Sequence, residues 1–268
     1  MAPDTLGIIA GNGSYPRLLA DSARRAGVKR IHAIAFTGET DPVLGEHVDT
    51  IEWTRVGQLG RMLTLFDTQG IHHAVMAGQI SPKNLFDLRP DWKALLLLAR
   101  LKTRNAETIF AAIADELGKI GVTLLPATTF LEDHLVRAGL LAGPQLSRRE
   151  EEDIEFGWKI AKEIARLDVG QTIVVKNGTV LAVEAFEGTN ETLKRGGSLG
   201  RQGAIMIKVA KPNQDMRFDV PVIGLETIRV ATEARLRVIA LEADQTLLLE
   251  KEALIEAAMR AQISIVAR

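Results

Sequence analysis

Short apolar runs alternate with amphipathic stretches along the first half of the chain. Strands are expected at residues 6–10, 31–36, 74–77 and 122–126, and helices at 15–26, 57–66 and, in two pieces, 90–118. The helical stretches repeat their apolar residues at spacings of three and four, whereas the strand runs are short and continuous. Strands and helices that alternate in this way predict a parallel sheet covered by helices.

The second half has a different pattern, with a hairpin and a glycine-rich stretch. Strands are expected at residues 172–175, 180–186, 204–209, 237–241 and 263–266, and helices after Ser147, after Gly188, and at 227–235 and 251–261. Asn177-Gly178 separates the first two of these strands and is a strong hairpin signal. The glycine-rich residues 196–203 are expected to follow the helix that begins after Gly188. The pattern therefore predicts two α/β domains, 1–131 and 148–268, with a linker at 132–147.

Composition and charge narrow the classes of protein. Of the 268 residues, 46% are hydrophobic and 25% charged, and the net charge is −1, so we expect no general nucleic-acid binder. The chain has no cysteine, which excludes disulfides, zinc–thiolate sites and cysteine nucleophiles. The first residues lack the pattern of a signal peptide, and no apolar run approaches the ~20 residues that span a bilayer. We therefore expect a soluble, cytoplasmic protein.

A glycine turn between the first expected strand and helix is a candidate anion site. It reads Gly11-Asn12-Gly13-Ser14. Glycine lets a ligand approach the backbone, and the helix that follows offers its N–H groups and positive dipole end to a phosphate. The dinucleotide-binding fingerprint has a third glycine where this chain has Pro16. A tight turn without a ligand is the competing interpretation.

A second loop, from Ala77 to Pro82, directly follows a predicted strand and contains Gly78 and Gln79. Open α/β sheets bind ligands at the carboxyl ends of their strands, so this loop and the glycine turn are expected along one edge. A plain connecting loop that ends at Pro82 is the alternative.

Two further groups of polar residues lie in the second half. Glu184 and Glu187 end an apolar strand and would suit a hard cation such as magnesium, although their odd separation points them to opposite faces of a regular strand. The second group is a proline-punctuated stretch at 208–224, in which cations would neutralise phosphate oxygens and a carboxylate would hold a metal or orient water. Its charged residues are Lys208, Lys211, Asp215, Arg217 and Asp219. Solvated charge at a strand end is the alternative for the first group, and by spacing alone a polar surface loop is the favoured interpretation of the second.

Residues 92–102 form an unusually apolar helical stretch. Four successive leucines follow Trp92, and the flanking cations are Lys93, Arg100 and Lys102. A helix that is apolar on all sides is either buried or in contact with lipid, so the alternatives are a core or dimer helix and a helix at a membrane surface.

Several of these segments, in this order, resemble the LpxI family of UDP-2,3-diacylglucosamine pyrophosphatases along nearly the whole chain. The matching segments are 6–13 (LGIIAGNG), Ala77-Gly78, 166–171 (RLDVGQ), 183–189 (VEAFEGT) and 208–224 (KVAKPNQDMRFDVPVIG). Single glycine turns are weak evidence, whereas the last three blocks in this order and spacing are strong evidence. The resemblance implies an N-terminal Rossmann-like parallel-sheet domain and a distinct C-terminal catalytic α/β domain, with substrate between them.

The resemblance also implies an activity. Such enzymes hydrolyse UDP-2,3-diacylglucosamine to 2,3-diacylglucosamine 1-phosphate (lipid X) and UMP, a magnesium-dependent step of lipid A synthesis at the cytosolic face of the inner membrane in Gram-negative bacteria. The expected partners are this substrate and product, the membrane surface, and a second copy in a homodimer. Two alternatives remain open: a nucleotide-sugar-binding regulator without catalysis, and a nucleotide-cofactor oxidoreductase.

The residue roles follow the motif. The catalytic aspartate maps onto Asp219, which would bind magnesium together with Glu187 or would orient water. The cations expected at the phosphates are Lys208, Lys211 and Arg217. The expected substrate-binding residues are Gly11, Asn12, Gly13, Ser14, Gly78, Gln79, Thr189 and Asn190. The family block usually has aspartate where this chain has Asn190, which would bind a metal without charge, or would cap a helix equally well.

Overall fold

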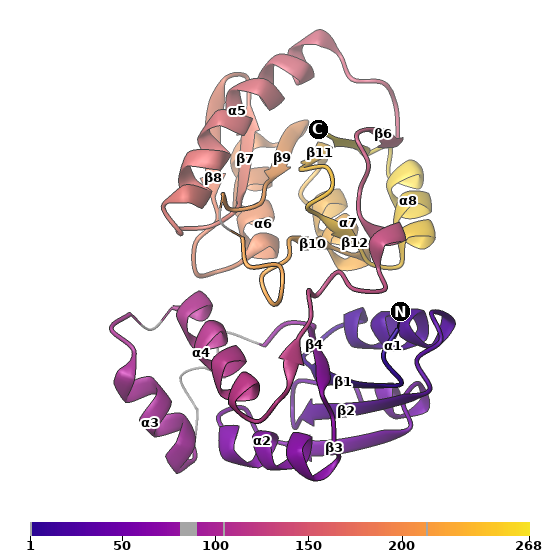
Figure 1. Cartoon of the computed structure of the whole chain (residues 1–268). Helices are drawn as coiled ribbons and strands as arrows, with labels where there is room; N and C mark the ends of the chain where they lie inside the picture. The colour runs from indigo at the N-terminus through magenta and orange to yellow at the C-terminus, as the bar shows by residue number, and fades with distance from the viewer. Residues whose placement is uncertain (1, 81–89, 104, 213) are drawn as a thin grey trace. The chain divides into compact units, whose positions relative to one another are not determined.

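The computed structural model describes residues 2–80, 90–103, 105–212 and 214–268 (Figure 1). The chain divides into two compact units. Unit 1 contains Met1–Glu132 and Asp215–Asp219, and unit 2 contains Asp133–Gln214 and Val220–Arg268. The expected two-domain α/β architecture is confirmed, with one difference: five residues of the second half pack with the first unit.

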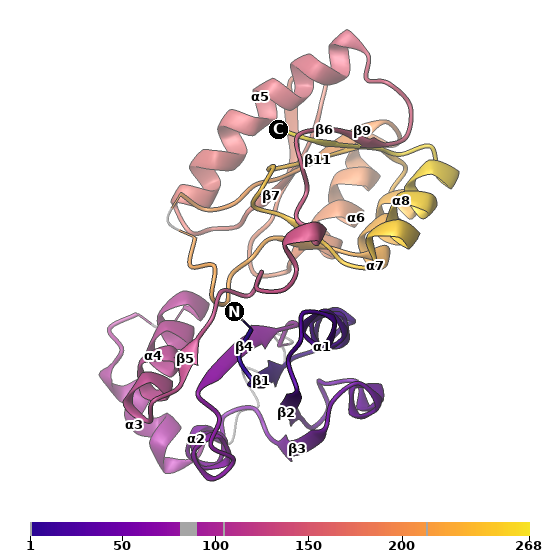
Figure 2. The ribbon, with the colours of Figure 1, turned by 45° about the vertical axis from the view of Figure 1, so that its right-hand side comes forward.

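Unit 1 is built on a parallel sheet with the strand order β3-β2-β1-β4-β5. In chain order its elements are β1 (Thr5–Ala10), α1 (Tyr15–Arg25), β2 (Arg30–Phe36), η1 (Pro42–Glu46), β3 (Thr50–Thr54), α2 (Leu59–Thr68), β4 (His73–Ala77), α3 (Trp92–Arg100), α4 (Ala106–Lys119) and β5 (Thr123–Leu124). Helix α1 packs on β1 and β4, whereas α2, α3 and α4 share a core with the other side of the sheet (Figure 2). The order reverses direction at β1, which is the switch point where open α/β sheets bind ligands.

Unit 2 has a mixed six-stranded sheet with the order β6-β13-β11-β9-β7-β8. Its elements are β6 (Gly139–Ala142), α5 (Arg148–Arg166), β7 (Thr172–Lys176), β8 (Thr179–Val183), α6 (Thr189–Gly200), β9 (Ala204–Lys208), β10 (Val222–Ile223), α7 (Leu225–Glu233), β11 (Leu236–Leu241), β12 (Leu247–Leu248), α8 (Lys251–Arg260) and β13 (Ser264–Ala267). Helix α5 covers one face, and α6, α7 and α8 pack on the other (Figure 1). The hairpin expected at Asn177-Gly178 joins β7 to β8, with both residues at positive φ.

Two segments differ from the expectation. The stretch 132–147, expected to be a linker, contains β6, which pairs antiparallel with β13 and belongs to unit 2 from Asp133 onward. The glycine-rich residues up to Gly200 are part of α6. A Cβ at Gly196 would lie 2.5 Å from the Cβ of Val174, and a Cβ at Gly197 would lie 2.4 Å from the Ala234 carbonyl oxygen. These glycines therefore let α6 approach the sheet and α7 closely, and they do not end the helix.

Candidate active site

In unit 1, the glycine turn and the loop after β4 lie against each other at the carboxyl ends of β1 and β4. The N–H of Gly11 donates to the Ala77 carbonyl at 2.7 Å. Asn12 and Gln79 exchange two backbone hydrogen bonds, at 2.7 and 3.2 Å. The expectation that both segments share one edge is confirmed for residues 77–80, while Ser81 and Pro82 lie outside the described residues.

The close approach of these loops explains two glycines. A Cβ at Gly11 would lie 2.7 Å from the Gln79 carbonyl oxygen, and a Cβ at Gly78 would lie 2.6 Å from the Asn12 carbonyl oxygen. Gly78 also has φ +90°. Both residues are thus required by backbone packing, and the binding of a phosphate there stays a prediction.

A cavity of about 180 Å³ adjoins the glycine turn. It is lined by Asn12, Gly13, Ser14, Pro16, Arg17, Thr40, Asp41, Val43 and Leu44. Gly13 has φ +90°, and among the described residues no atom lies within 4 Å of the Cβ it would carry. The cavity therefore lies at the start of α1 and at the switch point of the sheet, where backbone N–H groups and the helix dipole favour an anion.

Sequence reasoning missed the polar lining residues that follow β2, Thr40 and Asp41. Thr40 is buried, accepts a hydrogen bond from the Phe36 N–H at 2.9 Å and donates to the Ala10 carbonyl at 2.5 Å. Asp41 begins η1 and accepts from the Val43 N–H at 3.0 Å. Their position directly after the second strand, beside the switch point, was the available signal.

The segment Asp215–Asp219 packs within unit 1. The N–H of Ala127 donates to the Met216 carbonyl at 2.7 Å, and the rings of Phe218 and Phe110 lie 5.6 Å apart. Phe218 also packs against the core formed with α2, α3 and α4. Asp219, although expected in the C-terminal domain, is therefore held in the same unit as the glycine turn, because these apolar and backbone contacts draw its segment there.

Tyr15 connects this segment to the start of α1. Its buried hydroxyl donates to the Ala127 carbonyl at 2.5 Å, and Ala127 in turn holds Met216. Burial raises the pKa of Tyr15 above its ordinary value, so the hydroxyl stays a neutral donor. The sequence indicated only a packing role for this tyrosine.

Arg217, expected at a phosphate, forms a forked ion pair with Asp215. Its Nε and Nη2 atoms lie 3.0 and 2.7 Å from the two carboxylate oxygens. The hydrogen bond from Arg217 lowers the pKa of Asp215 and outweighs burial, which raises it. The N–H of Asp219 donates to the Asp215 carbonyl at 3.0 Å. Arg217 thus holds the tight turn that presents Asp219.

In unit 2, the structure brings two of the expected residues together around a buried ammonium group. Lys208 is 4% exposed, and its Nζ lies 2.9 Å from the Thr189 Oγ1 and 3.2 Å from the Thr172 Oγ1. Thr189 donates to Glu184, itself buried, at 2.8 Å. Lys208 ends β9, Thr172 begins β7 and Thr189 begins α6, so the cluster lies at a strand end beside a helix N-terminus. The Thr172 partner was not predicted.

Glu187 and Asn190 flank this cluster on the chain. Glu187 accepts from Arg195 at 2.5 Å and from the Ala185 N–H at 3.2 Å. Burial raises the pKa of Glu187, but hydrogen bonds from its own backbone N–H, from Arg195 and from Ala185 lower it overall. Asn190 is the second residue of α6, whose cap position is Gly188, so it does not cap this helix. Glu184 and Glu187 both follow the end of β8, and only Glu184 is buried.

Lys211 forms an ion pair with Asp168, which lies in the family segment 166–171. Its Nζ lies 2.5 Å from the Asp168 Oδ1, and its N–H donates to the Gln214 side chain at 2.5 Å. Lys162 and Glu242 form an ion pair that hydrogen-bonds both backbone groups of the preceding residue, Ala210. Lys162 donates to the Ala210 carbonyl at 2.9 Å, and the Ala210 N–H donates to Glu242 at 2.7 Å. These contacts fix the path of the chain as it leaves β9, and no local sequence signal indicated Lys162 or Glu242.

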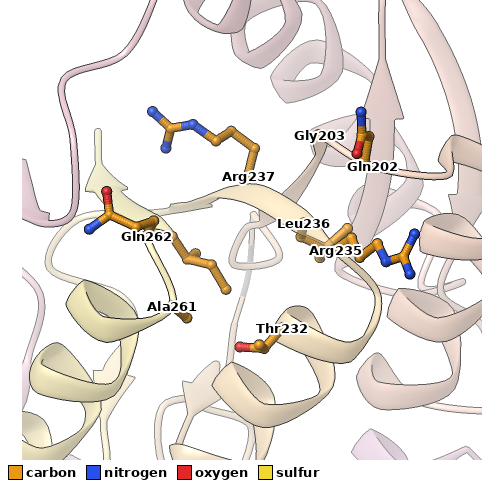
Figure 3. Close-up of a pocket in the computed structure, with 9 residues that line it drawn as sticks. Gln202, Gly203, Thr232, Arg235, Leu236, Arg237, Ala261 and Gln262 are labelled. Carbon is orange, nitrogen blue, oxygen red and sulfur yellow. The ribbon is translucent and has the colours of Figure 1, made fainter.

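Figure 3 shows another cavity in unit 2, beside the amino end of β9, whereas Lys208 lies at the carboxyl end of that strand. It has a volume of about 450 Å³ and is lined by Gln202, Gly203, Thr232, Arg235, Leu236, Arg237, Ala261, Gln262 and Ile263. The side chains of Arg235 and Arg237 point apart in Figure 3, and Arg237 is held by Ser264 at 2.7 Å and Glu150 at 3.2 Å. None of the predicted site residues lines this cavity, so it is not the candidate site.

Within the residues that the structure describes, no group of three or more histidine, cysteine, aspartate or glutamate side chains is arranged to hold a metal ion. No helix in the same ranges has the length and apolar character to cross a membrane.

Comparison with known proteins agrees with the resemblance seen in the sequence. The LpxI N-terminal domain matches residues 5–134 and the LpxI C-terminal domain matches residues 137–266. A relative from Caulobacter vibrioides, UDP-2,3-diacylglucosamine pyrophosphatase LpxI, is 32% identical over an alignment that covers 94% of this chain and 93% of the relative.

Solved structures give a weaker likeness. The biotin carboxylase domain of Hydrogenobacter thermophilus 2-oxoglutarate carboxylase is 11% identical, with a TM-score of 0.30 over 74% of this chain and 41% of that one. The biotin carboxylase subunit of a pyruvate carboxylase is 12% identical, with a TM-score of 0.28 over the same shares. Similarity this low carries no argument about function. The two family domains and the full-length relative are sufficient: the chain belongs to the LpxI family.

Proposed function

We propose that the protein hydrolyses UDP-2,3-diacylglucosamine to 2,3-diacylglucosamine 1-phosphate (lipid X) and UMP, a step of lipid A biosynthesis. The observation that carries the proposal is the 32% identity to the Caulobacter vibrioides pyrophosphatase over nearly the full length of both chains. This relationship favours hydrolysis over the regulator and the oxidoreductase.

The reaction needs little covalent chemistry from the protein. The oxygen of a water molecule bonds to the phosphorus nearer the sugar, the bond from that phosphorus to the bridging oxygen breaks, and the bridging oxygen leaves with UMP. Negative charge builds on the leaving phosphate, so catalysis depends on positioning and on charge stabilisation.

The residues of unit 1 suit the nucleotide side and the attack. The cavity beside Gly13 and the start of α1 would take the uridine phosphate. Asp219, presented by the Asp215–Arg217 turn, would orient the attacking water or bind the metal. The hydrogen bonds through Ala127 tie these two features together within the unit.

The cations of unit 2 would neutralise the diphosphate. Lys208 is already desolvated, so its charge acts in a low-dielectric setting where it stabilises an anion more strongly than in water. Lys211 is held by Asp168 and would contribute a second positive charge.

Magnesium is the proposed cofactor. Mg²⁺ is commonly held by one or two carboxylates together with substrate phosphates, so the Asp219 carboxylate would be enough as its protein ligand. Glu187 is engaged by Arg195 and would have to give up that pair to bind metal. Bound magnesium would supply charge stabilisation at the phosphate oxygens.

The experiment follows UMP release by chromatography from purified protein, UDP-2,3-diacylglucosamine and Mg²⁺. We expect Asp219→Asn to lower kcat by about 10²–10⁴-fold. The matched control is Asp244→Asn, which removes an exposed carboxylate paired with Arg137 and should leave kcat unchanged. Turnover should stop in EDTA and return with Mg²⁺. A folded Asp219→Asn variant with wild-type turnover would refute the assignment.

A further inference from the structure

Helix α3 presents an apolar stripe to solvent. Trp92, Leu95 and Leu96 are 73%, 45% and 40% exposed, and the exposed Ala99 lies one turn further on. These positions fall three, four and seven residues after Trp92, so they share one face of the helix. Scattered apolar side chains on a surface need no explanation, but a continuous helical stripe with tryptophan at its end does.

The opposite face of α3 is firmly held, so the stripe is a fixed feature. Ala94 and Leu97 are buried in the core shared with α2 and α4. Asp91 caps the helix by accepting from the Ala94 N–H at 2.9 Å, and it reaches α2 by accepting from the Gly60 N–H at 2.7 Å. The sequence left open a core or dimer helix and a helix at a membrane surface. The exposure of Trp92, Leu95 and Leu96 excludes a core helix, so a dimer contact and a membrane surface remain.

Within residues 92–102, the charged side chains beside the stripe are all positive. Residues 92–102 contain Lys93, Arg100 and Lys102 and no acidic residue, and all three cations are exposed. The nearby Glu116 of α4 is paired with Lys119 at 2.5 Å. An apolar stripe with tryptophan and flanking cations is the composition of helices that lie in the headgroup region of an anionic bilayer.

We propose that the α3 face docks on the surface of an anionic phospholipid bilayer. This inference rests on the proposed function, because a diacylated substrate resides in a bilayer. A second copy of the chain fits the face less well. A stable interface covers roughly 800 Å² per partner, more than one face of this short helix offers, and in a symmetric contact the cations beside the stripe would face the same set of cations on the second copy.

The test is co-sedimentation of the full chain with phosphatidylcholine vesicles, prepared with and without phosphatidylglycerol. The variant is Trp92→Gln/Leu96→Gln, which keeps the buried face of α3 intact. Its matched control is Leu199→Gln/Met259→Gln, which changes two side chains of similar exposure, 61% and 54%, outside this face. A third variant, Lys93→Gln/Arg100→Gln, tests the charge.

We expect wild-type protein and the control to bind the anionic vesicles. The Trp92→Gln/Leu96→Gln variant should bind at least about tenfold more weakly, because it loses both large apolar side chains that enter the headgroup region. The affinity of the charge variant for anionic vesicles should fall by about fivefold per removed cation, and its affinity for neutral vesicles should not change. All variants should hydrolyse detergent-dispersed substrate at the wild-type rate, since none of these residues belongs to the candidate active site.

Two results would overturn the proposal. One is wild-type protein that stays in the supernatant with both kinds of vesicle. The other is a concentration-dependent dimer that Trp92→Gln/Leu96→Gln abolishes without vesicle binding, which would assign the face to a second copy. Vesicle binding needs no turnover, so absence of UMP with the wild-type protein would refute the proposed function separately.

Discussion

Tyr15→Phe removes one hydroxyl from the connection between α1 and the segment that carries Asp219. The hydroxyl is buried and donates to the Ala127 carbonyl at 2.5 Å, while the N–H of Ala127 holds the Met216 carbonyl at 2.7 Å. Phenylalanine leaves the buried carbonyl without this donor, at a cost of about 1–3 kcal/mol. Since 1.4 kcal/mol corresponds to a factor of ten, the held arrangement should be about 5- to 150-fold less favoured.

Hydrogen exchange at the Ala127 amide measures this equilibrium directly. Its N–H is protected while it donates to Met216, so we expect Tyr15→Phe to exchange at least about fivefold faster. The value of kcat should fall by no more than the factor by which exchange becomes faster. Only molecules in which the segment has separated from Ala127 have Asp219 out of place, and the others turn over normally. KM should change less, since the cavity beside the glycine turn keeps its lining.

The control is Thr68→Val, which removes an exposed hydroxyl that donates to a backbone carbonyl on α2 at 2.8 Å. Water replaces that bond, so exchange at Ala127 and turnover should match the wild type. The reasoning would be refuted by a Tyr15→Phe protein whose Ala127 amide exchanges at the wild-type rate, because the segment would then be held without this hydroxyl.

Three other changes have expected outcomes. Gly11→Ala places a Cβ 2.7 Å from the Gln79 carbonyl oxygen and should lower the thermal midpoint, whereas Gly11→Ala with an unchanged midpoint would show that the loops separate freely. Lys208→Met removes a buried charge and should reduce UMP release while the denaturation midpoint stays equal or rises, and a large loss of stability would contradict this. The pKa of Asp215 is lowered in the folded state, so its pair with Arg217 contributes stability above the ordinary aspartate pKa, and this stability is lost as pH falls through the lowered pKa. Arg217→Gln should therefore reduce the pH dependence of the unfolding free energy in this range. An unchanged acid-unfolding profile would exclude the pair as the cause of that pH dependence.

Local pattern was sufficient for most elements of the fold. The apolar runs at 6–10, 31–36 and 74–77 correspond to β1, β2 and β4, because buried parallel strands are continuously apolar. Strand β3 was missed: Thr50–Thr54 lies at the sheet edge and carries polar residues among its apolar ones, so it lacks that signal. The glycines of α6 were misread because they are explained by tertiary contacts, of Gly196 with Val174 and of Gly197 with Ala234.

The candidate site was less accessible to sequence reasoning. Spacing alone left residues 208–224 as an ordinary polar stretch, and the family resemblance was needed to select Asp219. The position of Asp219 in unit 1 depends on contacts between residues far apart in the sequence, such as Ala127 with Met216, which no local pattern contains. The hydrogen bond of Tyr15 to Ala127, and those of Lys162 and Glu242 to Ala210, also join residues far apart in the sequence and have no local signal.

Unit 1 includes the five residues Asp215–Asp219 from the second half of the chain, and this limits where the gene can be divided. A fragment that ends at Glu132 would lack Asp215–Asp219 and would expose the ring of Phe110 and the amide of Ala127 that these residues cover. The missing peptide would be supplied only by co-expression with a fragment that carries it. The natural boundary after Glu132 is thus a poor place to cut, and dissection of this enzyme is better done by point substitution than by truncation.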